Sequence, residues 1–212
     1  MTIRPLERRN GLAAFALAGL FTIIPACNSA PSTTGEAGSM NASTPESLLA
    51  SLKSAADASL NDYYAALQSV TDCEQLPEVC RMLSAREAAA REMMALRSTL
   101  VKEYGEQGEA ASTMMLRGAF LDQFEEIQRA TVFTGAGDAA VLRIGTAVYR
   151  LRLRDGDWVI VRFPDPPYDP AAIADAIEIV VTRVEAVRKD IVAGRIPSMS
   201  ELERRLAMAL GE

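Results

Sequence analysis

The chain has 212 residues with 22 basic and 28 acidic side chains, a formal net charge of −6, and no histidine. An acidic chain repels phosphate backbones, so no nucleic-acid partner is expected. The lack of histidine removes the commonest general acid–base group, the Ser–His and Cys–His nucleophile pairs and most zinc sites, so no enzyme activity, metal or cofactor is predicted.

The first 26 residues have the three parts of an export signal. Three arginines come before an uninterrupted apolar run at residues 11–24, and an exit with a small residue follows. The run is shorter than the about 20 apolar residues that a membrane-spanning helix needs. Residues 1–26 are therefore predicted to be a signal peptide, and the protein is expected in the cell envelope, on the periplasmic or cell-surface side.

The exit Ile24-Pro25-Ala26-Cys27 resembles a bacterial lipobox, in which an aliphatic residue and, two positions later, a small residue precede the cysteine that is acylated. Pro25 departs from the small residue usual there. Two or three acyl chains on Cys27, at about 0.8 kcal/mol per buried CH₂, would anchor the protein stably in a membrane. The alternative is a secreted, non-lipidated protein cut near Ala26 or Ala30.

Residues 27–43 consist mainly of Ser, Thr, Ala, Gly, Pro and Asn and are predicted to be a flexible tether. Residues 44–212 fit a single domain. Removal of residues 1–26 takes away three arginines and one glutamate, which leaves 19 basic and 27 acidic residues and a net charge of −8. The exported part is therefore more acidic than the whole chain.

The domain begins with a helix signal, because Thr44 has the side chain of an N-cap and Pro45 suits the first helical position. Apolar residues at helical spacing continue to Leu67, and Asn61-Asp62 is expected to divide this segment into two helices. A second helical segment is predicted from Ser84, which forms a capping box with Glu87, to Gly105, and a shorter helix is predicted over residues 109–116.

Cys73 and Cys80 are predicted to form a disulfide, since an exported chain with two nearby cysteines favours a bridge. Seven residues of straight helix span about 10.5 Å, beyond the roughly 7 Å limit between bridged Cα atoms. The chain therefore has to turn between the two cysteines, and Pro77 favours a turn there. Two buried free thiols are the alternative.

From about Ile127 the apolar period changes from 3.6 to 2. Asp155-Gly156 is a strong hairpin signal, and with Gly145-Thr146 as the preceding turn the two registers agree. Strands are predicted at residues 127–134, 138–144, 147–154 and 157–163. One face of this meander is predicted to be core and collects Ala140, Leu142, Ile144, Tyr149, Leu151, Leu153, Trp158 and Ile160.

The second sheet face collects Val141, Arg143, Val148, Arg150, Arg152, Val159, Val161 and Phe163. Three arginines on an apolar floor suit bidentate capture of a carboxylate or phosphate, so Arg143, Arg150 and Arg152 are candidate ligand-binding residues. The alternative is a solvated face, with arginine stems over valines and charged heads in water.

The chain then returns to helix. Asp169 and Pro170 start a long amphipathic helix that Gly194 closes, and Ser198 with Glu201 has the pattern of a capping box before a final short helix. The order of helices, antiparallel meander and helices predicts an α+β fold.

Two stretches resemble the small nuclear-transport-factor-2-like (cystatin-like) bacterial lipoproteins. One is TPESLLASLKSAADASLNDYYAAL. The other is TGAGDAAVLRIGTAVYRLRLRDGDWVIV, in which Gly137, Asp138, Ala140, Leu142, Asp155, Gly156 and Trp158 carry the likeness. The resemblance implies a curved sheet wrapped by helices into a cone with a pocket, and it implies the non-catalytic branch of that superfamily. Residues 169–212 add two helices where many members end in a strand.

The sequence thus predicts a non-catalytic, membrane-anchored lipoprotein that acts as an extracytoplasmic binding or scaffold domain. A small anionic-ligand binding protein that uses the arginine-lined sheet face is the alternative. An enzyme that uses Asp, Glu, Tyr or Lys alone has no specific support in the sequence.

Overall fold

The computed structural model describes residues 40–116, 120–135, 137–164 and 169–211. The predicted signal peptide, the acylation candidate Cys27 and most of the predicted tether lie outside these residues. The described chain is α+β, with helices first, then a four-stranded antiparallel meander, then two helices, as predicted. In the described residues no helix is both long enough and apolar enough to span a bilayer.

Two short helices open the domain. Helix α2 (Pro45–Ala58) is capped by Thr44, whose side chain accepts a hydrogen bond from the Ser47 backbone N–H, while the Ser47 hydroxyl group accepts one from Thr44 N–H. Helix α3 (Leu60–Ser69) is capped by Ser59. The break between the two helices was expected at Asn61-Asp62 and lies two residues earlier, because the Ser59 side chain bonds the Asp62 N–H and ends the first helix.

Helix α4 (Pro77–Leu116) contradicts the predicted start at Ser84. That residue lies inside the helix, and its hydroxyl donates to Gln68 Oε1 at 3.0 Å. The predicted stop at Gly105 is a sharp bend, with a φ of 56°, after which the chain becomes helical again. The two arms lie close, since a Cβ on Gly108 would stand 2.0 Å from the Leu100 carbonyl oxygen.

Helix α5 (Phe120–Gln128) precedes the sheet and was not predicted, so the expected strand at 127–134 is correct only in its last four residues. The strands are β1 (Thr131–Thr134), β2 (Ala139–Ile144), β3 (Ala147–Arg154) and β4 (Asp157–Arg162), in spatial order β1-β2-β3-β4. The turn between β3 and β4 has positive φ at both Asp155 and Gly156, as the predicted two-residue hairpin requires.

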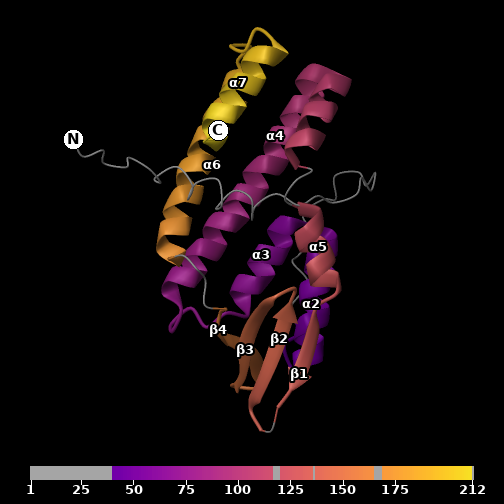
Figure 1. Cartoon of the computed structure of the whole chain (residues 1–212), viewed down its shortest axis with the longest axis vertical. Helices are drawn as coiled ribbons and strands as arrows, with labels where there is room; N and C mark the ends of the chain where they lie inside the picture. The colour runs from indigo at the N-terminus through magenta and orange to yellow at the C-terminus, as the bar shows by residue number, and fades with distance from the viewer. Residues whose placement is uncertain (1–39, 117–119, 136, 165–168, 212) are drawn as a thin grey trace, which may run out of the picture.

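One face of the sheet packs on the first helices, and Figure 1 shows α2 behind it. Six of the eight predicted core residues of this face are buried, namely Ala140, Leu142, Ile144, Leu151, Trp158 and Ile160. Tyr149 is partly buried against the same cluster, whereas Leu153 is 37 % exposed because it lies beside the hairpin turn. The main core therefore lies between this face and α2, α3 and the first turns of α4.

The two C-terminal helices begin where predicted. Helix α6 (Pro170–Val192) is capped by Asp169, and α7 (Met199–Leu210) is capped by Ser198. Helix α6 packs along α4, and α7 packs on α6 and joins the same apolar cluster, away from the sheet (Figure 1). A partly buried ion pair joins Arg188 on α6 to Glu92 on α4, with Nε and Oε1 2.5 Å apart. These three helices form a helical lobe next to the sheet lobe.

The sheet is an open meander that is not strongly curled (Figure 1). The cone with an interior pocket, which the resemblance implied, is not formed by the residues that the structure describes. This follows from the topology, because a four-stranded meander keeps two separate edges and the C-terminal helices pack on α4 rather than on the sheet.

Candidate functional site

The sheet face away from the core carries the candidate arginines. Pairing between β1, β2, β3 and β4 places its residues in four cross-strand rows. The first row is Thr131, Arg143 and Val148, the second is Phe133, Val141, Arg150 and Arg162, the third is Ala139, Arg152 and Val159, and the fourth, beside the β3–β4 turn, is Arg154 and Asp157. We call this surface the arginine face. It brings the three predicted arginines onto one side of the sheet, one in each of the first three rows.

A β-bulge in β4 changes the predicted membership of this face. Leu151 pairs with Ile160, but Arg150 pairs with Arg162, so Val161 is an extra residue without a partner. One extra residue exchanges the two sides of the strand beyond it. The placement of Phe163 on the second face is therefore wrong: Phe163 packs against the core cluster and meets Tyr149 edge to face, with ring centroids 5.0 Å apart.

Side chains on the arginine face are open to solvent. Arg143, Arg150 and Arg152 are all exposed. Two apolar side chains are exposed among them, Phe133 at 55 % and Val148 at 39 %. The arginines thus extend from a nearly flat surface and do not line a cavity. This geometry matches the solvated alternative more closely than an enclosed ligand site.

Three arginines of this face form no ion pair within the described residues. Within the described ranges, no carboxylate lies at ion-pair distance from Arg143, Arg150 or Arg152. The Arg143 guanidinium stands 5.8 Å from the centre of the Phe133 ring, within the range of a cation–π contact. The face is therefore a basic patch on a chain whose overall charge is negative.

The edge of the sheet next to this face is covered by two earlier segments of the chain. The Trp158 N–H donates to the Ala42 carbonyl at 2.7 Å, and the Ile160 N–H donates to the Val70 carbonyl at 2.7 Å. The Asp72 N–H in turn donates to the Ile160 carbonyl at 2.9 Å. These hydrogen bonds give partners to backbone groups on the outer edge of β4. They also fix where the N-terminal segment enters the domain.

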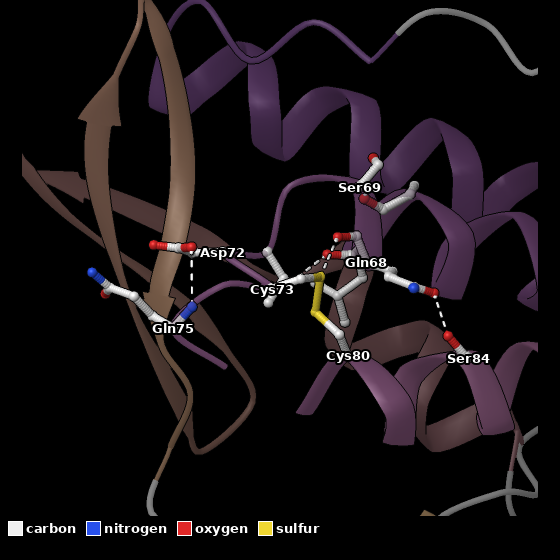
Figure 2. The surroundings of a disulfide bond; sticks show 10 residues. Gln68, Ser69, Asp72, Cys73, Gln75, Cys80 and Ser84 are labelled. Carbon is white, nitrogen blue, oxygen red and sulfur yellow. Dashed lines mark hydrogen bonds between the residues drawn. A yellow bond between two sulfur atoms is a disulfide. The ribbon is translucent and has the colours of Figure 1, made fainter. Parts of the chain in front are cut away.

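A buried carboxylate lies at this edge. The Asp72 side chain is 4 % exposed, and its Oδ2 atom lies 2.6 Å from Arg154 Nη1, close enough for an ion pair but without the alignment of a hydrogen bond. Its Oδ1 atom accepts from the Gln75 N–H at 3.3 Å, as Figure 2 shows. Arg154, the third arginine of β3, is thus neutralised, in contrast to Arg150 and Arg152.

The predicted disulfide between Cys73 and Cys80 is present, with Cα atoms 5.6 Å apart. The turn that allows it is built by Asp72, whose carbonyl accepts from the Leu76 N–H, and Pro77 begins α4 directly afterwards. Figure 2 shows the bridge joining this turn to the first turn of α4 beside the sheet. The bridge therefore holds the segment that covers β4 and supports Asp72.

Other titratable groups serve the fold. Burial raises the pKa of the Tyr63 hydroxyl group well above its usual value, and that ring is part of the core. Hydrogen bonds from Arg204 and then Arg205 lower the pKa of Glu201 to about 2 at the start of α7. In the described part of the chain, no three His, Cys, Asp or Glu side chains gather as a metal site requires.

Three residues of this region were not singled out from the sequence. Arg162 was hidden by the bulge, which pattern counting does not detect. Asp72 and Arg154 are 82 positions apart in the chain, and no local pattern links them. The alternating arginines of β3 continue to Arg154, and this was the only sequence feature that could have identified Arg154 as part of the region.

Comparison with known proteins gave no match to any family model, to any curated protein or to any solved structure.

Proposed function

We propose that the chain is a non-catalytic lipoprotein of the cell envelope, anchored through Cys27, and that its domain acts as a binding or scaffold domain through the arginine face. The observation that carries the proposal is the exposed positive charge of Arg143, Arg150 and Arg152, which have no ion-pair partner and no covering helix among the residues that the structure describes. A surface patch of one charge sign attracts partners of the opposite sign.

The N-terminal sequence supports the placement. The apolar run at residues 11–24 and the lipobox-like exit before Cys27 are followed by a polar stretch that suits a tether. The resemblance to nuclear-transport-factor-2-like lipoproteins agrees with this role, and membership of that group is part of the proposal. The lack of histidine in the whole chain supports a role without acid–base chemistry.

A small anionic ligand is the less supported occupant of the same face. Pockets for small molecules are concave and bury about 70–90 % of the ligand surface. Here the arginines stand in separate rows on an open surface, so a small anion would keep most of its hydration. An extended partner, which covers several rows at once, makes better use of this geometry.

The placement is tested on the full chain expressed in a bacterial host. Protein extracted from membranes with detergent is digested, and its N-terminal peptide is identified by mass spectrometry. We expect a chain that begins at Cys27 and carries a diacylglyceryl group, with residues 1–26 removed. Cys27→Ser should take up no labelled fatty acid, whereas the matched variant Ser29→Ala should be labelled like the wild type. An unmodified mature N-terminus would refute the proposal.

A further inference from the structure

The structure points to a partner for the arginine face: we propose that it docks on an anionic phospholipid surface, that of the same bilayer that holds the acyl chains on Cys27. This inference rests on the proposed lipid anchor. It goes further by stating that the domain lies on the membrane in a defined orientation and is not merely suspended from it.

The charges of the face fit such a surface. Arg143, Arg150 and Arg152 come from adjacent strands and point to one side, and no carboxylate within the described residues lies at ion-pair distance from them. Basic side chains near an anionic membrane each strengthen binding about five-fold, which corresponds to roughly 1 kcal/mol. A second copy of the chain fits poorly, because face-to-face pairing would bring its arginines against these.

The apolar side chains of the face lie where an interface needs them. Phe133 and Val148 are exposed in the two rows that contain Arg143 and Arg150. An aromatic ring among basic residues is typical of surfaces that settle between lipid headgroups. The Arg143 contact with the Phe133 ring keeps the charge beside the apolar group.

The acidic residues of the sheet set the orientation. Asp138, Asp155 and Asp157 lie at the end of the sheet where the β1–β2 loop and the β3–β4 turn meet. The row of Arg143 and Val148 lies at the opposite end, beside the Gly145 turn. An anionic surface attracts the second end and repels the first, so the face is expected to approach the bilayer tilted, with the row of Arg143 nearest.

The point where the tether joins the domain allows this arrangement. The described chain begins at Met40, and Ala42 accepts the hydrogen bond from Trp158 on β4, so the chain enters at one edge of the sheet. The segment from Cys27 to Met40 spans at most about 45 Å when extended. Trp158 lies beside the β3–β4 turn, so the chain enters at the acidic end, away from the row of Arg143. The sheet is about 15 Å across and about 27 Å long along β3, so the row of Arg143 still lies within reach of the anchor.

Docking is measured on the lipidated full chain in vesicles, with a polarity-sensitive dye on a single introduced cysteine. Thr131→Cys places the dye in the row of Arg143 and leaves the arginines and the exposed apolar side chains of the face in place. Met208→Cys places it on exposed helix α7 in the helical lobe, as the reference position. Vesicles of neutral phosphatidylcholine are compared with vesicles that contain about 30 % phosphatidylglycerol as the anionic lipid.

We expect the dye at position 131 to report an apolar environment with anionic vesicles and water with neutral vesicles, and the dye at position 208 to report water with both. Replacement of Arg143, Arg150 and Arg152 by alanine should lower the ratio of docked to undocked protein about 100-fold. The triple variant Arg91→Ala, Lys102→Ala and Arg183→Ala removes the same charge from the helical lobe and should dock like the wild type.

Two further experiments distinguish a membrane from a small anion as the partner of the arginine face. The triple arginine-to-lysine variant keeps the charge but loses the planar fork, so it should still dock on a membrane, whereas a bidentate small-anion site would be lost. Salt at about 1 M, which shortens the screening length to about 3 Å, should release the face from the vesicle while the anchor stays.

The two proposals fail in different ways. If the protein is lipidated but the dye at position 131 reports water on anionic vesicles, the docking proposal is refuted. The proposal of a lipid-anchored domain is not affected by that result. Displacement of the face by millimolar citrate, together with loss of docking in the lysine variant, overturns the membrane as the occupant in favour of a small anion. A chain without acyl groups on Cys27 overturns both proposals.

Discussion

The disulfide makes a quantitative prediction. The Cys73–Cys80 bridge joins residues seven positions apart, and the chain-entropy model gives such a short loop about 2.5 kcal/mol of stabilisation at 25 °C. The double variant Cys73→Ala, Cys80→Ala should therefore lose about 2.5 kcal/mol of free energy of unfolding. Cys80 is buried, so the missing sulfur atom adds a smaller packing loss in the variant alone.

Urea unfolding of three species separates these contributions: the oxidised wild type, the wild type reduced with a phosphine, and the double variant. The reduced wild type keeps both sulfur atoms, so its difference from the oxidised protein isolates the loop closure. The reductant should not change the double variant. Equal unfolding midpoints for oxidised and reduced wild type would refute the entropic reasoning.

The bridge also has a local consequence that equilibrium unfolding does not detect. It holds the turn from which the Asp72 N–H donates to the Ile160 carbonyl at the edge of β4. Without the bridge this turn should open more often than the sheet as a whole, because local unfolding follows local stability. Hydrogen exchange should therefore accelerate at the Asp72 amide by more than at Leu142 in the centre of the sheet.

Two further predictions concern the helical lobe. Gly108→Ala places a Cβ 2.0 Å from the Leu100 carbonyl oxygen, so we expect the free energy of unfolding, measured in urea, to fall by about 1–3 kcal/mol. The same change in an open helix is stabilising by about 1 kcal/mol. Unchanged stability would contradict the close approach of the two arms. Glu201 has a pKa of about 2 in the folded protein, below its usual 4.5, so its contribution to stability is present above about pH 4.5 and is lost as the pH falls toward 2. Glu201→Gln should therefore flatten the fall in melting temperature over that range, and identical acid profiles for the two proteins would count against the ion pairs with Arg204 and Arg205.

Local signals predicted the parts of the fold that local chemistry controls. The caps at Thr44, Asp169 and Ser198 are confirmed, because each side chain bonds a backbone N–H within its own first turn. The register between Leu151 and Ile160 is confirmed as well, since a two-residue turn at Asp155-Gly156 leaves one way to pair the strands.

The predictions that were wrong concern features that depend on residues far apart in the sequence. Ser84 has the side chain of an N-cap, but the disulfide and the turn at Asp72 start the helix at Pro77, and Ser84 bonds Gln68 on α3 instead. The bulge at Val161 is another case, because the alternation of apolar and polar residues in β4 is compatible with a regular strand and with a strand that has one extra residue. Both outcomes depend on tertiary contacts that a single segment does not encode.

The composition of β3 provides the last argument for a role of the arginine face. Its core side needs only Tyr149 and Leu151, so the fold leaves the alternating positions free to be any polar residue. Those positions hold Arg150 and Arg152, and neither forms an ion pair within the described residues. Solvent exposure alone asks only for a polar residue there and does not favour arginine. Since natural sequences depart from local stability rules mainly at functional sites, two open arginines at these positions agree with the proposed anionic partner.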